Sequence, residues 1–161
     1  PRNYTKQYEI EIVLREMAEQ VAIRLRRIHK KATVVAIHIG FSCEEKAKTI
    51  NTSMKVNPTQ STEELTNHVL ALFREKYTGG AVRNIGIRYN KLIDESYSVF
   101  TLFDDVKAIE KREKLERAID KIRDRFGYLS IQKANFLMEG SRVRERSKLI
   151  GGHCGGMDGM I

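Results

Sequence analysis

Alternation of large and small side chains over residues 33–42 constrains the fold more than any other feature. The large apolar residues Val35, Ile37, Ile39 and Phe41 take every second position. Successive side chains of a β-strand point to opposite faces, so these residues share one face. Similar alternation covers residues 48–56 and 81–93. The sequence therefore predicts three strands of a sheet that buries one face.

Two amphipathic helices are predicted, one before the first of these strands and one between the second and the third. Residues 9–28 carry apolar side chains at helical spacing. The second helix begins at Ser61, where a Ser N-cap is followed three residues later by Glu64, and it ends at the Gly79-Gly80 pair. With a short strand at residues 2–5 the order is βαββαβ. This order predicts an α+β fold for residues 1–96, with two helices on one face of an antiparallel-rich sheet.

Beyond this domain we expect a connector at residues 97–105 and a helical, basic extension at 106–161 that ends in a Gly-rich tail. A helix is predicted from residue 104 to 126. Its narrow apolar stripe favours docking on the protein's own domain, with a coiled coil as the alternative. A second short helix is predicted at residues 131–138. Residues after 140 are rich in Arg and Gly and are expected to be mobile.

The predicted sheet face opposite the helices lacks carboxylates. Its residues are Ala36, His38, Gly40, Ser42, Thr49, Asn51, Ser53, Lys55, Asn84, Gly86 and Arg88. The same alternation places Val82 on this face and Arg83 on the apolar face. A solvated face is one interpretation. Such faces usually mix acidic and basic residues, however, and the chain carries a net charge of +8. The alternative interpretation is a surface that lies against a nucleic-acid backbone.

Catalytic and metal-binding patterns are not found. Neighbouring carboxylates lie at predicted turns or helix starts, and the four histidines are scattered. Two distant cysteines, Cys43 and Cys154, argue for a reducing compartment, which favours the cytoplasm. No segment has the roughly 20 apolar residues needed to cross a bilayer. We therefore expect no catalytic residue, no metal site, no cofactor and no membrane association in this chain.

The apolar run Val99-Phe100-Thr101-Leu102-Phe103 lies between polar segments. Exposed apolar groups of this size favour association. Either the protein's own core covers these side chains, or a second protein does.

Several stretches resemble the little finger domain of Y-family translesion DNA polymerases. They are the βαββαβ order, the start Pro1-Arg2-Asn3-Tyr4 and the strand Val82-Arg83-Asn84-Ile85-Gly86-Ile87-Arg88. Later stretches are similar to the UvrX and ImpB/MucB/SamB-type subgroup: Leu102-Phe103-Asp104-Asp105, Arg125-Phe126-Gly127, Ser130-Ile131-Gln132-Lys133-Ala134, Glu139-Gly140-Ser141-Arg142 and Arg146-Ser147-Lys148-Leu149-Ile150-Gly151-Gly152-His153. The resemblance spans essentially the whole chain.

The resemblance implies a grip on double-stranded primer–template DNA. The implied DNA-binding residues are Arg2, His38, Ser42, Thr49, Asn51, Ser53, Lys55, Arg83, Asn84, Gly86 and Arg88. The family often has an Arg where this chain has Asn84. The palm domain that carries the family's polymerising carboxylates and Mg²⁺ is not in this chain. The resemblance therefore assigns polymerase activity to an expected parent protein, a nucleotidyltransferase. This parent is expected to act in the bacterial SOS response to DNA damage, in the cytoplasm at the nucleoid.

The resemblance also gives the apolar run a partner. Val99, Phe100, Leu102 and Phe103 are similar to a peptide that binds the sliding clamp, with Val99 where the family has Gln. An alternative function is a non-catalytic interaction module that binds the clamp or a recombination filament. Oligomeric state, lesion specificity and fidelity are left open by the sequence.

Overall fold

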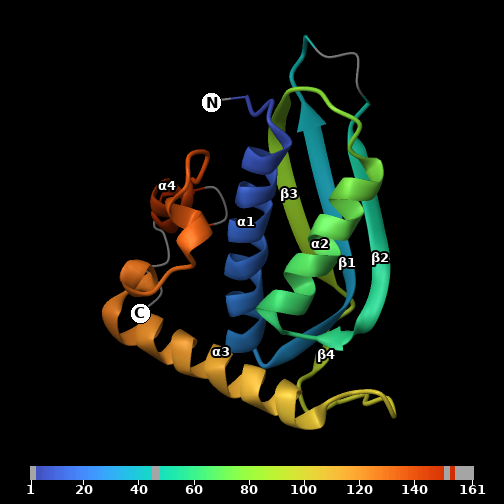
Figure 1. The fold of residues 1–161 in the computed structure, drawn as a ribbon, viewed down its shortest axis with the longest axis vertical. Coiled ribbons are helices and arrows are strands. Elements are labelled where there is room, and N and C mark those ends of the chain that lie inside the picture. The colour runs from blue at the N-terminus through green and yellow to red at the C-terminus, as the bar shows by residue number, and fades with distance from the viewer. Residues whose placement is uncertain (1–2, 45–47, 151–152, 155–161) are drawn as a thin grey trace. The chain divides into compact units, whose positions relative to one another are not determined.

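The computed structural model describes residues 3–44, 48–150 and 153–154 of the chain. The chain forms two compact units, Pro1–Phe100 and Thr101–Ile161. The first unit contains, in chain order, α1 (Gln7–Arg27), β1 (Lys30–Phe41), β2 (Ile50–Thr59), α2 (Thr62–Lys76), β3 (Val82–Asn90) and β4 (Ile93–Asp94), shown in Figure 1. The α+β class predicted from the sequence is confirmed.

Strand β1 is the centre of the sheet. It pairs antiparallel with β2 on one side and β3 on the other, and its first two residues pair with β4. Beyond β3, Tyr4 forms an isolated bridge with Val82 through two backbone hydrogen bonds of 2.8 Å. Among the described residues, the strand predicted at 2–5 is therefore reduced to this single bridge.

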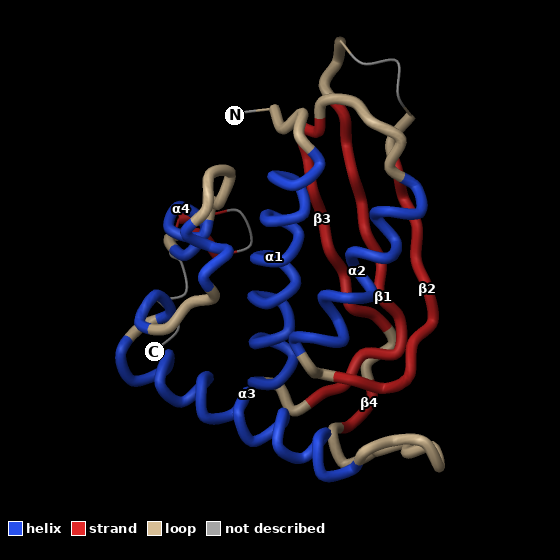
Figure 2. Tube along the Cα trace, in the orientation of Figure 1, coloured by secondary structure: helices blue, strands red, loops and turns tan. Residues whose placement is uncertain are grey.

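Helices α1 and α2 cover one face of the sheet, as Figure 2 shows. The predicted alternation in β1 is confirmed, because Val35, Ile37 and Ile39 are at most 1% exposed. The helices meet them with apolar side chains that include Ile10, Leu14, Ala18, Leu65, Val69 and Phe73. Tyr89 joins this core, and its hydroxyl donates to the carbonyl of Ala18 at 3.0 Å. Burial raises the pKa of Tyr89.

The two helices are tied to each other by an ion pair. Arg74 of α2 makes two hydrogen bonds with the Glu11 carboxylate of α1, with N···O distances of 2.9 and 2.6 Å. These bonds lower the pKa of Glu11. The predicted N-cap is confirmed, since the Ser61 side chain accepts from the backbone N–H of Glu64.

Two strand predictions needed correction. Strand β2 continues through Pro58 to Thr59, whereas the alternation in the sequence predicted a strand that ends at residue 56. The register between β1 and β2 shifts at this point, and β2 is an edge strand, where a missing N–H is tolerated. The pairing register between β1 and β3 shifts between Gly40 and Phe41 of β1, which leaves Arg83 of β3 as the extra residue of a bulge. As a result, Val82 is buried in the core and Arg83 is exposed. The sequence prediction had assigned these two residues to the opposite faces.

The second unit begins with the long helix α3 (Val106–Phe126). It continues through the 3₁₀ turns η1 (Tyr128–Ser130) and η2 (Ala134–Leu137), helix α4 (Val143–Ser147) and the hairpin strands β5 (Leu149–Ile150) and β6 (His153–Cys154). The helix predicted at residues 131–138 is wrong, because that stretch holds only a 3₁₀ turn. Arg123 fixes the turn after α3: its guanidinium donates to the carbonyl of Ile131 at 2.9 and 3.1 Å and lies 4.9 Å from the Tyr128 ring centroid.

The apolar stripe of α3 remains largely exposed. Leu115, Ile122 and Phe126 are 59%, 40% and 66% exposed.

Candidate nucleic-acid interface

The sheet face opposite the helices is built from cross-strand rows, each with one residue from β2, β1 and β3. In that strand order the rows are Lys55–Val34–Asn90, Ser53–Ala36–Arg88 and Asn51–His38–Gly86. Gly40 and Asn84 extend the pattern toward the bulge. Because paired residues on one face of a sheet lie side by side, the polar side chains of three separate segments form one surface.

This surface has basic charge and no acidic charge. Its exposed side chains are His38, Asn51, Ser53, Lys55, Asn84, Arg88 and Asn90. No Asp or Glu occurs anywhere in residues 30–41, 50–59 or 82–90. The surface can therefore receive phosphates without carboxylate repulsion, and its amide, hydroxyl and cationic groups can donate hydrogen bonds to them.

Small residues in the middle of the surface leave it without projecting side chains. Ala36 and Gly40 are buried beneath their neighbours, and Gly86 is half-buried. The guanidinium of Arg88 extends across β1, where its Nη2 atom lies 3.5 Å from Oδ1 of Asn51. A flat strip with long cationic side chains at its border permits close approach of a backbone.

The remaining predicted contact residues lie in different surroundings. Thr49 is exposed immediately before β2, and Arg83 is exposed at the bulge. Ser42 is buried, and its backbone N–H donates to the carbonyl of Ala81, so its side chain is not part of the exposed surface. Arg2 lies outside the described residues. Asn90, which the sequence analysis missed, could have been found by continuing the alternation two residues past Arg88.

A second candidate site is the apolar run at residues 99–103, here called the hook. Leu102 and Phe103 are 101% and 97% exposed, and Val99 and Phe100 are more than half exposed. A tight turn presents the tip: the N–H of Asp104 donates to the carbonyl of Thr101, and the Asp104 carboxylate accepts from the N–H of Thr101 at 2.6 Å. The sequence left open whether these side chains are covered by the protein's own core or by a second protein. In the structure they lie outside the core.

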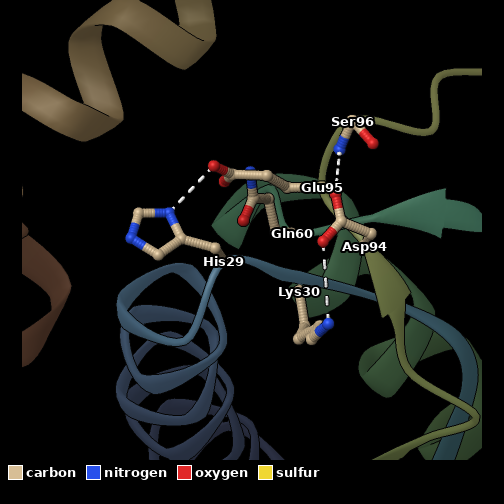
Figure 3. A network of polar contacts seen from close by, with 6 residues as sticks. All are labelled: His29, Lys30, Gln60, Asp94, Glu95 and Ser96. Carbon is tan, nitrogen blue, oxygen red and sulfur yellow. Dashed lines mark hydrogen bonds and ion pairs between the residues drawn. The ribbon is translucent and has the colours of Figure 1, made fainter.

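Polar contacts fix the segment that leads to the hook (Figure 3). The Glu95 carboxylate lies 2.8 Å from Nδ1 of His29 and accepts from Gln60 at 3.2 Å. Asp94 accepts from the backbone N–H of Ser96, and this bond is the main reason why the pKa of Asp94 is lowered. The buried ammonium of Lys31 donates to the carbonyl of Tyr97 at 2.8 Å and to the hydroxyl of Ser98 at 3.1 Å. The chain is therefore held at the sheet as far as Ser98.

Two other kinds of site are a metal centre and a membrane-spanning helix. Over residues 3–44, 48–150 and 153–154, no three His, Cys, Asp or Glu side chains gather closely enough to hold a metal ion. None of the helices in the described part of the chain combines the length and the apolar composition needed to span a bilayer.

The class of protein follows from a match to a known family. Residues 1–102 match the impB/mucB/samB family C-terminal domain. The chain belongs to this family, and it corresponds to the C-terminal region of Y-family DNA polymerases, as the sequence resemblance indicated.

Relatives support the same assignment across both units. The chain is 31% identical over 153 residues to the putative UV-damage repair protein UvrX of Bacillus subtilis (strain 168), covering 94% of this chain and 36% of the relative. It is 29% identical over 154 residues to DNA polymerase IV 2 of Halalkalibacterium halodurans, covering 95% of this chain and 37% of the relative. The chain thus spans a little over a third of the length of these relatives.

Proposed function

We propose that this chain grips primer–template DNA for an error-prone Y-family polymerase in translesion synthesis and DNA repair. The observation that carries the proposal is the exposed sheet face of β1, β2 and β3, whose strands hold no carboxylate. The contact residues are those exposed on or beside this face: His38, Thr49, Asn51, Ser53, Lys55, Arg83, Asn84, Arg88 and Asn90. Arg2, outside the described residues, and the half-buried Gly86 complete the proposed set.

Contacts of this kind read the backbone rather than the bases. Lys55 and Arg88 would neutralise phosphates, while the amide and hydroxyl groups between them would donate hydrogen bonds. The grip is therefore expected to be independent of DNA sequence and strongly weakened by salt, because each phosphate contact releases condensed counterions.

The test measures binding of a fluorescent primer–template duplex at several salt concentrations. Lys55→Gln combined with Arg88→Gln should reduce the slope of log affinity against log salt by about 1.8, at about 0.9 per contact. The matched control is Arg27→Gln with Lys76→Gln, which removes equal charge from the helix-covered side and should leave the slope unchanged. Equal slopes for the two variants would contradict the proposal.

The hook is proposed to bind the sliding clamp. Its Leu102 and Phe103 side chains are fully exposed at the tip of the turn, and complete burial of each in an apolar pocket would contribute about 1.5–3 kcal/mol. Val99 stands where the family's Gln would hydrogen-bond the clamp, so the apolar pair is expected to supply most of the affinity.

Leu102→Ala with Phe103→Ala should abolish binding to a purified bacterial clamp in surface plasmon resonance, with no fall in melting temperature. Leu137→Ala with Met138→Ala removes another exposed apolar pair and should leave clamp binding intact. A clamp complex without any DNA binding would instead support the alternative function, a protein-interaction module that works through the hook or engages a recombination filament.

The polymerising carboxylates and their Mg²⁺ ions are proposed to lie in another part of the parent protein. The place of action proposed for the parent is the cytoplasm, at the nucleoid, during an SOS response to DNA damage.

A further inference from the structure

Helix α3 carries a basic stripe, with one alanine in it, beside its apolar stripe. The stripe consists of Lys107, Lys111, Lys114, Ala118, Lys121 and Arg125. Successive members are four, three, four, three and four residues apart, the spacing that keeps side chains on one face of an α-helix. At 1.5 Å per residue, the stripe extends about 27 Å along the helix.

The acidic residues of α3 lie outside this stripe. Glu113, Glu116 and Asp120 fall on other faces of the helix, whereas Glu110 and Asp124 border the stripe, three residues after Lys107 and Lys121 respectively. All six members of the stripe are exposed. Within the described residues, no hydrogen bond or ion pair holds any of its four lysines. The cationic groups are therefore available to a partner.

Helix stability alone does not account for the stripe. Cations are favourable at the C-terminal end of a helix, and this explains Arg125. Lys107, in contrast, lies in the first turn, where the helix dipole favours acids, and this turn contains no acidic residue. A lysine is thus present where helix energetics disfavour it.

We propose that this basic stripe binds the phosphate backbone of DNA, as a contact surface separate from the sheet face. The inference rests on the proposed function in taking DNA as the polyanion. A row of exposed lysines that hold no ion pair among the described residues is complementary to a row of phosphates. The small Ala118 at its centre leaves room for a backbone between Lys114 and Lys121. The apolar stripe beside it is interrupted by Arg112, which makes it a poor match for a lipid surface.

The experiment compares the whole chain with a triple variant, Lys107→Gln, Lys114→Gln and Lys121→Gln. Binding to a fluorescent hairpin duplex and to a single strand of the same length is measured against salt concentration. The salt slope should fall by about 2.7 for the substrate that the stripe contacts, at about 0.9 per phosphate for a duplex. Glutamine preserves helix propensity, and unchanged helical circular dichroism verifies that α3 stays folded.

The matched control removes three exposed charges of the second unit outside helix α3 through Lys133→Gln, Arg144→Gln and Lys148→Gln. Its salt slope should match that of the unchanged chain. Equal slopes for the stripe variant and this control would overturn the proposal. Loss of binding to vesicles of phosphatidylglycerol, with DNA binding equal to the control, would also overturn it and assign the stripe to a membrane surface.

The sheet variant Lys55→Gln with Arg88→Gln separates this inference from the proposed function. If only the sheet variant reduces the slope of log affinity against log salt, the proposed DNA grip of the sheet is supported and the stripe proposal fails. If only the stripe variant loses slope, the stripe binds DNA and the sheet grip fails.

Discussion

Gly40 and Asn84 face each other across β1 and β3, so closely that a side chain on the glycine would crowd Asn84. A Cβ atom on Gly40 would lie 3.2 Å from Cβ of Asn84, closer than ordinary van der Waals contact. Gly40→Ala is therefore expected to lower the free energy of unfolding by about 1–3 kcal/mol through overpacking. Urea denaturation followed by circular dichroism measures the effect.

Gly86 provides the control for this prediction. Its added Cβ would lie 3.4 Å from Cβ of His38, an ordinary contact, so Gly86→Ala should change stability by less than about 0.5 kcal/mol. Adding Asn84→Gly to Gly40→Ala should restore much of the lost stability. A neutral Gly40→Ala variant would show that Asn84 moves aside at little cost.

Lys31 is expected to control the mobility of the segment before the hook. Lys31→Met removes the two hydrogen bonds to Tyr97 and Ser98, at a cost of about 1–3 kcal/mol. Chymotrypsin should then cleave after the exposed Tyr97 faster than in the unchanged chain. Lys30→Met is the control, because Lys30 is partly exposed and lies 3.7 Å from Asp94. Equal cleavage rates for the two variants would refute this role of Lys31.

The turn at Thr101 and Asp104 is expected to preorganise the hook. Asp104→Ala removes the 2.6 Å bond to the N–H of Thr101, so the tip loses its fixed conformation. Clamp affinity should then fall several-fold, because ordering the turn costs free energy on binding. Titration calorimetry with the clamp measures this change.

A substitution at the neighbouring Asp105 distinguishes the effect of the turn from the effect of helix α3. Its side chain caps α3 by accepting from the N–H of Ala108, so Asp105→Ala should reduce the helical signal of the second unit, at a cost of about 1 kcal/mol. An Asp104→Ala variant with unchanged clamp affinity would show that the turn adds nothing to binding.

The Glu11–Arg74 pair is expected to make stability depend on pH in the acidic range. The pKa of Glu11 is lowered from 4.5, mainly by the Arg74 hydrogen bonds. Its contribution is therefore complete above pH 4.5 and is lost as pH falls through the lowered pKa. Arg74 is half exposed, which limits the contribution to about 0.5–1 kcal/mol.

Denaturation midpoints between pH 6 and pH 3 test this dependence. The unchanged chain should lose more stability over that range than Arg74→Gln, which lacks the pair. Parallel pH profiles would show that Glu11 is not stabilised by Arg74 in solution.

Local rules predicted much of the first unit. Alternation in residues 33–42 placed Val35, Ile37 and Ile39 in the core, and the Ser61 N-cap predicted where α2 begins. The bulge at Arg83 was missed because the hydrogen bonds of Tyr4, nearly eighty residues away, help to fix Val82. The register at the edge of a sheet depends on pairing with residues distant in sequence, and the periodicity of one segment carries no information about that pairing.

The sites show the same division. The acid-free face followed from strand alternation alone, apart from Ser42, Asn90 and the residues at the bulge. The exposure of Leu102 and Phe103 could not be decided from the sequence, since it depends on what the rest of the chain covers. The hydrogen bonds of Lys31 were also hidden, because they go to Tyr97 and Ser98, which are distant in sequence.

The central place of β1 has a consequence for synthesis of the chain. Both neighbours of β1 are made after it, and β3 is complete only at Asn90. A nascent chain that stops short of β3 leaves one long edge of an apolar strand unpaired, and such edges promote aggregation. Truncation before residue 90 is therefore expected to yield inclusion bodies rather than a smaller working domain.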